Sequence, residues 1–115
     1  MARPLLSGRV MADKRRHSRK KRRFLIEIET PGAISTGFTY DLSPDSIFIR
    51  SIRIPLPGSP VTARLSLPDG KRVALRGKVL RTYRAPIAMS RLVPSGFSLR
   101  LAEAPEDYGH FFATL

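Results

Sequence analysis

The sequence predicts a small, mostly β protein: a six-stranded antiparallel β-barrel followed by one C-terminal α-helix. Three observations lead to this prediction. The length of 115 residues suits one domain. From Phe24 onward, six short stretches have the composition of strands, four of them with alternating apolar and polar residues, and turn or loop residues separate them. The last residues have a helical spacing instead. Many short strands with a single closing helix are typical of a small barrel.

Residues that favour turns or loops lie between the predicted strands. The predicted strands cover residues 24–29, 34–40, 47–49, 61–67, 73–79 and 97–101. Pro31-Gly32 follows the first strand, and Pro68-Asp69-Gly70 joins the fourth to the fifth as a hairpin turn. Residues 54–60 are rich in proline, which lacks the N–H donor that a central ladder needs. Residues 84–95 are predicted to form a longer loop.

The end of the chain predicts a helix. Its apolar face would hold four residues at the spacing i, i+3, i+4 and i+7, namely Tyr108, Phe111, Phe112 and Leu115. Pro105, Glu106 and Asp107 come just before, where the first turn of a helix favours proline and acids. We expect this helix to close one end of the barrel.

The positive charge is concentrated at the N-terminal end. The chain has 21 Lys and Arg against 9 Asp and Glu, a formal net charge of +12. Residues 1–23 hold ten basic side chains and one acidic one. We therefore expect a disordered lead-in (1–13), a basic ligand-binding arm (14–23) and the barrel with its helix (24–115). Such an arm attracts a polyanion, which is a nucleic acid, an anionic lipid, an acidic protein or a phosphorylated small molecule.

Several classes of function are not supported by the composition. Cysteine is absent and histidine occurs twice, at His17 and His110, so we expect no disulfide, metal site or cofactor. No apolar run approaches the roughly 20 residues of a membrane helix. The opening residues lack the apolar stretch of a secretory signal, and a cytoplasmic location is expected. Since no catalytic triad, Gly-rich phosphate loop or carboxylate pair stands out, we expect no enzyme.

Two arginines within the arm are candidates for ligand contact. A solvated basic tail with non-specific affinity for nucleic acid is the simpler interpretation of the arm. However, Arg15 and Arg19 stand four residues apart. A guanidinium group donates two hydrogen bonds to the O6/N7 edge of guanine or lies flat on a purine face, so two of them could clamp one ligand. Arg16 and His17 are secondary candidates.

The stretch Asp41-Leu42-Ser43-Pro44-Asp45-Ser46 is the second candidate. Taken alone it is a turn, in which Asp and Ser side chains bond their own backbone. Alternatively, Asp41 and Ser43 stand two residues apart at a strand end and point the same way. A carboxylate there matches the N1–H and N2–H donors of guanine, while an arginine takes the opposite edge. Arg50 and Arg81 are secondary candidates, with a solvent-facing charge as the alternative for each.

Together these two motifs resemble those of the PilZ domain. Arg15-x-x-x-Arg19 lies ahead of the first strand, and Asp41-x-Ser43 lies between the second and third. The resemblance covers residues 14–115 and extends to segments 67–70, 77–81 and 96–100. In that family the RxxxR and [D/N]xSxxG motifs bind the bacterial second messenger cyclic di-GMP, and the fold is a six-stranded β-barrel with a C-terminal helix. The resemblance implies that the two arginines and the acid–hydroxyl pair hold the nucleotide.

This chain departs from the family pattern at one position. Ser46 stands where the pattern has glycine, and Asp45 precedes it. Glycine would permit a positive φ or a close approach of the ligand to the backbone, whereas serine fits only if φ is negative. Asp45 adds an anion near a dianionic ligand, which costs about 1 kcal/mol at a solvated distance of about 4 Å. We include Ser46 among the expected contacts, because the other four motif side chains are present.

The leading hypothesis is a non-catalytic receptor for cyclic di-GMP. The arm would close over the ligand, and the rearranged surface would then bind a downstream protein partner. Two alternatives stay open. In one, the chain is a PilZ-like interaction module that has lost the nucleotide because of Ser46. In the other, it is a basic barrel that binds RNA or DNA through its arm, with affinity that falls steeply with salt.

Overall fold

The computed structural model describes residues 19–89 and 95–115. Within them the chain forms seven strands, a short 3-10 helix and one α-helix. Their bounds are β1 Lys20–Lys21, β2 Leu25–Thr30, β3 Ala33–Leu42, β4 Ser46–Arg50, β5 Pro60–Ser66, β6 Arg72–Tyr83, η1 Ile87–Met89, β7 Gly96–Glu103 and α2 Glu106–Ala113.

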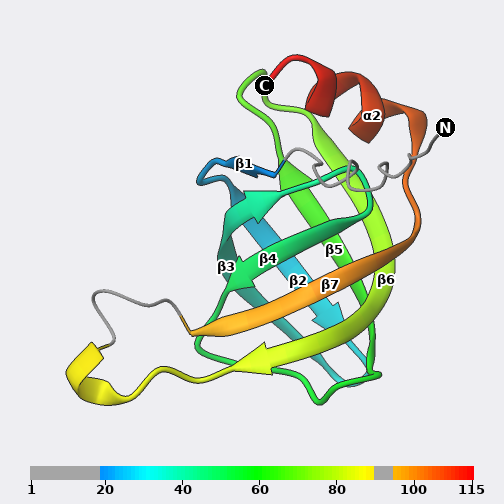
Figure 1. Cartoon of the computed structure of the whole chain (residues 1–115). Coiled ribbons are helices and arrows are strands. Elements are labelled where there is room, and N and C mark those ends of the chain that lie inside the picture. Colours follow the sequence, from blue (N-terminus) through cyan, green and yellow to red (C-terminus); the bar gives the residue numbers. More distant parts are fainter. Residues whose placement is uncertain (1–18, 90–94) are drawn as a thin grey trace, which may run out of the picture.

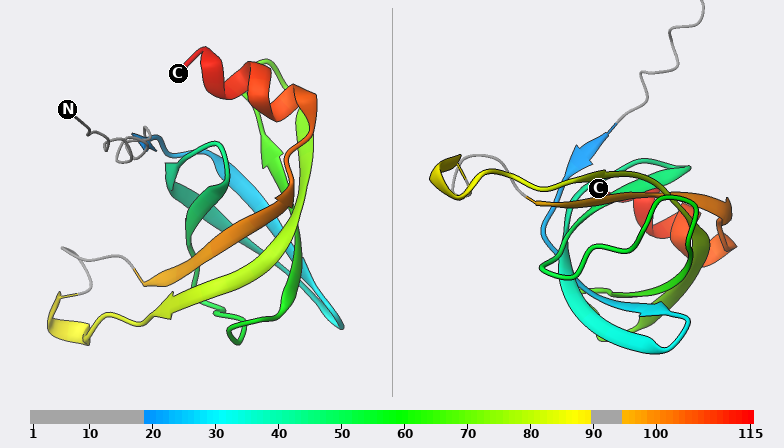
Figure 2. Two further views of the ribbon diagram at one scale, coloured as in Figure 1. Left: turned by 45° about the vertical axis from the view of Figure 1, so that its right-hand side comes forward. Right: turned by 90° about the horizontal axis from the view of Figure 1, so that it is seen from below.

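Six of the strands close into an antiparallel barrel. The hydrogen-bonded order is β1-β3-β2-β5-β6-β7-β4, and an additional β3–β4 pairing closes the strands from β3 to β4 into a ring. The strands form a closed ring when the molecule is seen from below, in the right-hand view of Figure 2. Strand β1 lies outside this ring and pairs with the end of β3. The predicted six-stranded barrel with a C-terminal helix is therefore confirmed.

Alternate side chains of the strands fill the barrel interior. In β5, Val61, Ala63 and Leu65 are buried, whereas the residues between them are partly exposed. The same alternation runs along β6, where every second residue from Val73 to Val79 is buried. This is the period-two pattern expected of strands with one dry and one wet face. Because a slip of one residue would expose this core, the alternation fixes the register of the barrel.

The helix α2 covers one end of the barrel (Figure 1). Tyr108 is fully buried, and Phe111 and Phe112 are partly buried against the core. The Phe24 and Phe111 rings meet edge to face, with centroids 5.3 Å apart. Glu106 and Asp107 occupy the first turn, where their charge complements the helix dipole. Three residues of the predicted apolar face therefore close the barrel, at the end that also holds β1, whereas the fourth, Leu115, lies beyond the end of α2.

The structure also differs from the sequence-based expectations. Strand β1 lies within residues 14–23, which were expected to form an arm, and it pairs Lys20 and Lys21 with Leu42 and Asp41 of β3. Strand β3 continues through Asp41, which was expected to lie in a turn. Backbone hydrogen bonds hold strand β1 against the end of β3. Pairing of this kind needs no alternation of apolar residues, so no sequence pattern predicted it. In the loop predicted at 84–95, η1 forms one short turn of 3-10 helix.

Candidate functional site

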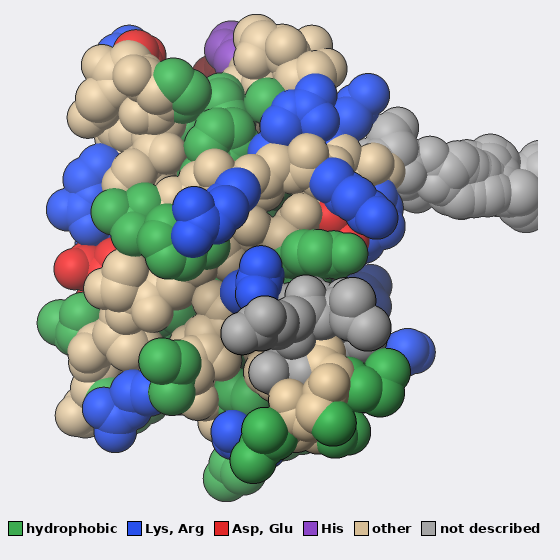
Figure 3. All heavy atoms as spheres, turned by 90° about the vertical axis from the view of Figure 1, so that its left-hand side faces the viewer, with side chains coloured by type: hydrophobic (Ala, Val, Ile, Leu, Met, Phe, Trp, Pro, Cys, Tyr) green, Lys and Arg blue, Asp and Glu red, His purple; other side chains and the backbone are tan. Residues whose placement is uncertain are grey.

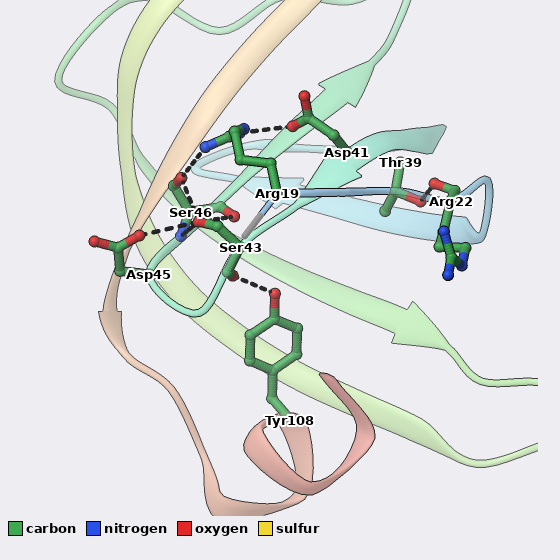
Figure 4. A network of polar contacts seen from close by, with 8 residues as sticks. All are labelled: Arg19, Arg22, Thr39, Asp41, Ser43, Asp45, Ser46 and Tyr108. Carbon is green, nitrogen blue, oxygen red and sulfur yellow. Dashed lines mark hydrogen bonds and ion pairs between the residues drawn. The ribbon is translucent and has the colours of Figure 1, made fainter. Parts of the chain in front are cut away.

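The candidate site lies where β1, the end of β3 and the start of β4 meet (Figure 4). The pairing of β1 with β3 places Arg19, the residue just before β1, beside Asp41. The turn from β3 to β4 brings Ser46, the first residue of β4, to the same place. Backbone pairing thus assembles three of the predicted site residues, although they come from distant parts of the sequence.

The Arg19 guanidinium contacts the side chains of Asp41 and Ser46. Its Nη2 donates to Oδ1 of Asp41 at 2.6 Å, and its Nη1 donates to the Ser46 hydroxyl at 3.0 Å. The Arg19 side chain is 45% exposed and that of Asp41 is 16% exposed. The carboxylate is therefore largely shielded, and its Oδ1 is bonded to Arg19. Charge-assisted bonds of this length are among the stronger polar contacts in proteins.

Ser43 lies inside the turn and is only 2% exposed. Its hydroxyl lies 3.0 Å from Oδ1 of Asp45 and 3.1 Å from the Ser46 carbonyl oxygen. The Ser46 N–H also donates to this hydroxyl, at 3.1 Å. These contacts are the local hydrogen bonds typical of Ser in turns. In this structure Ser43 shapes the turn, while Asp41 lies on the strand before it and reaches Arg19.

Ser46 fits its position without backbone strain. No residue other than glycine has a positive φ anywhere in the described parts of the chain. The glycine of the family pattern is thus not needed here for its backbone conformation. What serine adds is a hydroxyl, which lies 3.0 Å from the Ser43 hydroxyl and accepts a hydrogen bond from Arg19. The departure from the motif therefore supplies a contact that glycine could not make.

The turn is also attached to the closing helix. The Tyr108 hydroxyl donates to the Ser43 carbonyl oxygen at 2.6 Å, and this bond is buried. Burial raises the pKa of Tyr108 well above its ordinary value, so the hydroxyl keeps its proton and continues to donate. The helix α2 is thus linked through one residue to the loop that carries the motif.

Thr39 fixes the segment that follows Arg19. This residue of β3 is 1% exposed. Its hydroxyl accepts from the Phe24 N–H at 2.8 Å and donates to the Arg22 carbonyl oxygen at 2.7 Å. The Thr39 N–H donates in turn to the Phe24 carbonyl oxygen at 2.9 Å. Residues 20–24 are therefore attached to β3, and rearrangement of the arm around a ligand would have to begin at or before Arg19.

Replacement of Thr39 by valine should weaken this attachment. Thr39→Val keeps the shape of the side chain but removes both hydroxyl hydrogen bonds. We expect a loss of about 1 kcal/mol in the free energy of unfolding, because the freed groups lie near solvent. The control is Thr36→Val, an exposed position on the same strand. Urea unfolding of both variants measures the difference, and equal stabilities would show that the Thr39 contacts contribute nothing.

The other predicted residues lie elsewhere. Arg15, Arg16 and His17 fall outside the described residues. Arg50 is exposed at the far end of β4, and Arg81 is exposed on β6. Neither makes a hydrogen bond or ion pair with the motif turn in the described part of the chain.

The prediction missed two residues, Thr39 and Tyr108, as parts of the site. Thr39 was included only in a strand rich in Thr, Phe and Tyr, and Tyr108 only in the apolar face of the helix. The position of Tyr108 on the apolar face of the helix was a usable signal for Tyr108. A buried Tyr hydroxyl usually finds a hydrogen-bond partner, which here is the motif turn.

The described residues hold no cluster of metal ligands. No group of three His, Asp or Glu side chains within residues 19–89 and 95–115 could hold a metal ion. No described helix is long and apolar enough to cross a membrane. The site instead consists of an exposed arginine, a shielded carboxylate and a serine-rich turn on the rim of a small barrel.

The comparisons give the family. The family model of the PilZ domain matches residues 13–108. The match covers most of the chain, and the chain therefore belongs to the PilZ domain family, a family of non-catalytic receptors for cyclic di-GMP. The resemblance inferred from the two motifs is confirmed. No curated protein matches the chain in sequence.

Two solved structures share the fold. One is the inhibitor of motility of Bacillus subtilis (MotI/DgrA), with a TM-score of 0.70 and 15% identity. That match covers 85% of this chain and 47% of MotI/DgrA, so the chain spans about half the length of that protein. The other is the PilZ domain of CeSA from a cellulose synthesizing bacterium, with a TM-score of 0.59 and 18% identity. It covers 81% of this chain and 88% of that domain. Identities this low establish the fold alone.

Proposed function

We propose that this chain binds cyclic di-GMP at the rim formed by Arg19, Asp41 and the turn to Ser46. The observation that carries the proposal is the contact of Arg19 with both Asp41 and Ser46. Arg19 and Asp41 have the residue types of the two family motifs, Ser46 stands at the motif's glycine position, and the fold brings the three together. Family membership supplies the ligand class.

The proposed recognition follows from the donors and acceptors of guanine. The Asp41 carboxylate accepts from the N1–H and N2–H edge of a guanine base. The Arg19 guanidinium turns from Asp41 toward the O6/N7 edge, the purine face or a phosphate. Ser43 supports this arrangement by holding the turn. Arg15 is proposed as the second arginine of the clamp, and the downstream partner is proposed to be a protein that recognises the closed arm.

Calorimetric titration with cyclic di-GMP tests the proposal. We expect saturable heat from the folded protein, and little loss of it when GTP is added as a competitor. A folded protein that gives no heat at high micromolar ligand would contradict the proposal. Binding that falls steeply with salt, together with equal competition by other nucleotides, would instead favour the RNA- or DNA-binding alternative.

Removal of the Ser46 hydroxyl should tighten nucleotide binding. Arg19 donates to this hydroxyl in the free protein, so a ligand must replace that bond. Ser46→Ala and Ser46→Gly both remove it, and we expect each to raise the affinity about threefold, within the net value of one hydrogen bond. Calorimetry of the two variants beside the parent measures the change.

The two Ser46 variants also separate the possible causes. Equal gains in affinity for Ser46→Ala and Ser46→Gly would show that loss of the Ser46 hydroxyl causes the change. A gain for glycine alone would show that space or backbone freedom matters, contrary to this prediction. Binding that appears in Ser46→Gly from a parent with none would support the module that has lost the nucleotide.

A further inference from the structure

A groove on the side of the barrel lies apart from the motif turn. It has a volume of about 580 Å³ and runs between β3, the end of β4 and the segment that leads into η1. Its described lining includes three arginines, Arg23, Arg50 and Arg84, and no carboxylate. The motif residues Asp41, Ser43 and Ser46 are not among these lining residues.

The groove arginines lack acidic partners in the described structure. Elsewhere on the barrel, arginines are paired, as when Arg64 binds Glu27 and Glu29 at 2.9 and 2.5 Å. By contrast, Arg50 and Arg84 make no ion pair with any described residue. Figure 3 shows many Lys and Arg side chains and few carboxylates on the face that carries β3. Neighbouring like charges repel one another, so an anionic partner would be stabilised there.

One of these arginines is already held in place. The Arg23 guanidinium lies over the Phe38 ring, 3.9 Å from its centroid. Stacking on an aromatic ring keeps the fork of hydrogen-bond donors at the edge of the guanidinium available to a carboxylate. Arg50 is the cross-strand neighbour of Phe38, which places the second arginine beside this pair.

The groove also has apolar parts. Ile52 is 90% exposed and Ile87 is 93% exposed, and both line it. Aliphatic side chains exposed this far gain by contact with apolar groups of a partner. A nucleic acid would match the arginines but offers few aliphatic groups. A bilayer would match both, but its surface is flat, whereas this site is hollow.

We propose that this groove docks an acidic segment of a partner protein that carries apolar side chains beside its carboxylates. The carboxylates bind Arg23, Arg50 and Arg84, and the apolar side chains pack on Ile52 and Ile87. This docking is independent of nucleotide binding, and its test is made without nucleotide.

The test uses a fluorescein-labelled peptide of alternating glutamate and leucine and its glutamine counterpart. Anisotropy measures the binding of each peptide to the full chain. We expect the glutamate peptide to bind more tightly than the glutamine peptide, and Arg50→Glu or Arg84→Glu to weaken its binding about tenfold. The matched control is Arg76→Glu, the same charge change at an exposed position of β6 outside the groove, expected to weaken it less than about twofold.

A second pair of variants tests the apolar part. We expect Ile52→Ser to weaken peptide binding about threefold. Leu56→Ser is the control, because Leu56 is 77% exposed but does not line the groove. In the unmodified chain, the peptide should shift the amide NMR signals of Phe38, Ser51 and Ala85, which line the groove. This last measurement does not depend on any variant.

Two results would overturn the proposal. If Arg76→Glu weakened peptide binding as much as Arg50→Glu and Arg84→Glu, the peptide would be attracted only by the net charge of the protein. Binding to phosphatidylglycerol vesicles that is lost in Arg50→Glu, with no binding of the peptide, would assign the groove to a membrane surface instead.

Discussion

Arg19→Ala should lower the affinity for cyclic di-GMP about tenfold or more, because a bidentate arginine–guanine contact contributes about 1–3 kcal/mol. The variant also removes the charge that balances Asp41 in the free protein. The remaining carboxylate would then repel the ligand phosphates. Calorimetry of the variant and the parent at the same ionic strength measures the loss.

Lys21→Ala is the matched control for this loss. It removes one positive charge from the same arm, two residues away. Lys21 pairs with Asp41 through the backbone of β1 and β3, but its side-chain nitrogen lies 5.5 Å from the centre of the Tyr40 ring and forms no ion pair with Asp41 in the described structure. We expect a change of less than about twofold, since an exposed charge at this distance is screened by salt. Equal losses in the two variants would show that only the bulk charge of the arm matters.

Gly96→Ala should strongly destabilise the barrel. A Cβ atom at Gly96 would collide with the backbone carbonyl oxygen of Ile49 on the neighbouring strand. Strand β7 pairs with β4 directly through this position, so the two strands would have to separate. Because backbone atoms cannot move aside as side chains do, we expect a loss of about 3 kcal/mol in the free energy of unfolding.

Gly109→Ala is the control, and its effect should have the opposite sign. Nothing lies within 4 Å of a Cβ at Gly109, which sits within α2. Alanine favours the helix by about 1 kcal/mol over glycine, so this variant should be more stable than the parent. Urea unfolding of both variants provides the comparison. A Gly96→Ala variant as stable as the parent would mean that β4 and β7 do not approach as closely as described.

The barrel could be predicted because its information is local. The alternation of Val61, Ala63 and Leu65 specifies a strand and the face that it buries. Turn residues such as Pro68-Asp69-Gly70 mark where strands end. Strand β1 could not be predicted in this way. Its residues Lys20 and Lys21 have no apolar pattern, and their pairing with β3 depends on a surface that exists only after folding.

The site could be predicted in part. The types and order of its side chains indicated Arg19, Asp41 and Ser46, and the structure brings these three together. The sequence did not indicate that Ser43 is buried, because the fold decides which hydroxyl of a serine-rich turn faces inward. Nor did it indicate the contact between Arg19 and Ser46. That contact exists because serine, unlike the motif glycine, has an acceptor.

In the free protein, the proposed ligand site is therefore occupied by Arg19. Arg19 is bonded to the Asp41 carboxylate, which the ligand is proposed to meet, and to the Ser46 hydroxyl, and Thr39 holds the chain just after Arg19. A nucleotide would exchange these contacts for its own, and the free energy of the exchange would set its affinity. Tyr108 connects the same turn to α2, so a displaced turn would also change the packing of the helix.

The most direct test follows the backbone amides of Asp41 and Ser46 by NMR during titration with cyclic di-GMP. Their signals should shift saturably, and that of Gly32, in the turn before the opposite end of β3, should stay in place. The same titration of Arg19→Ala should need a higher ligand concentration for the same shift. Saturable binding that leaves the Asp41 and Ser46 signals unchanged would place the nucleotide elsewhere and contradict the proposed site.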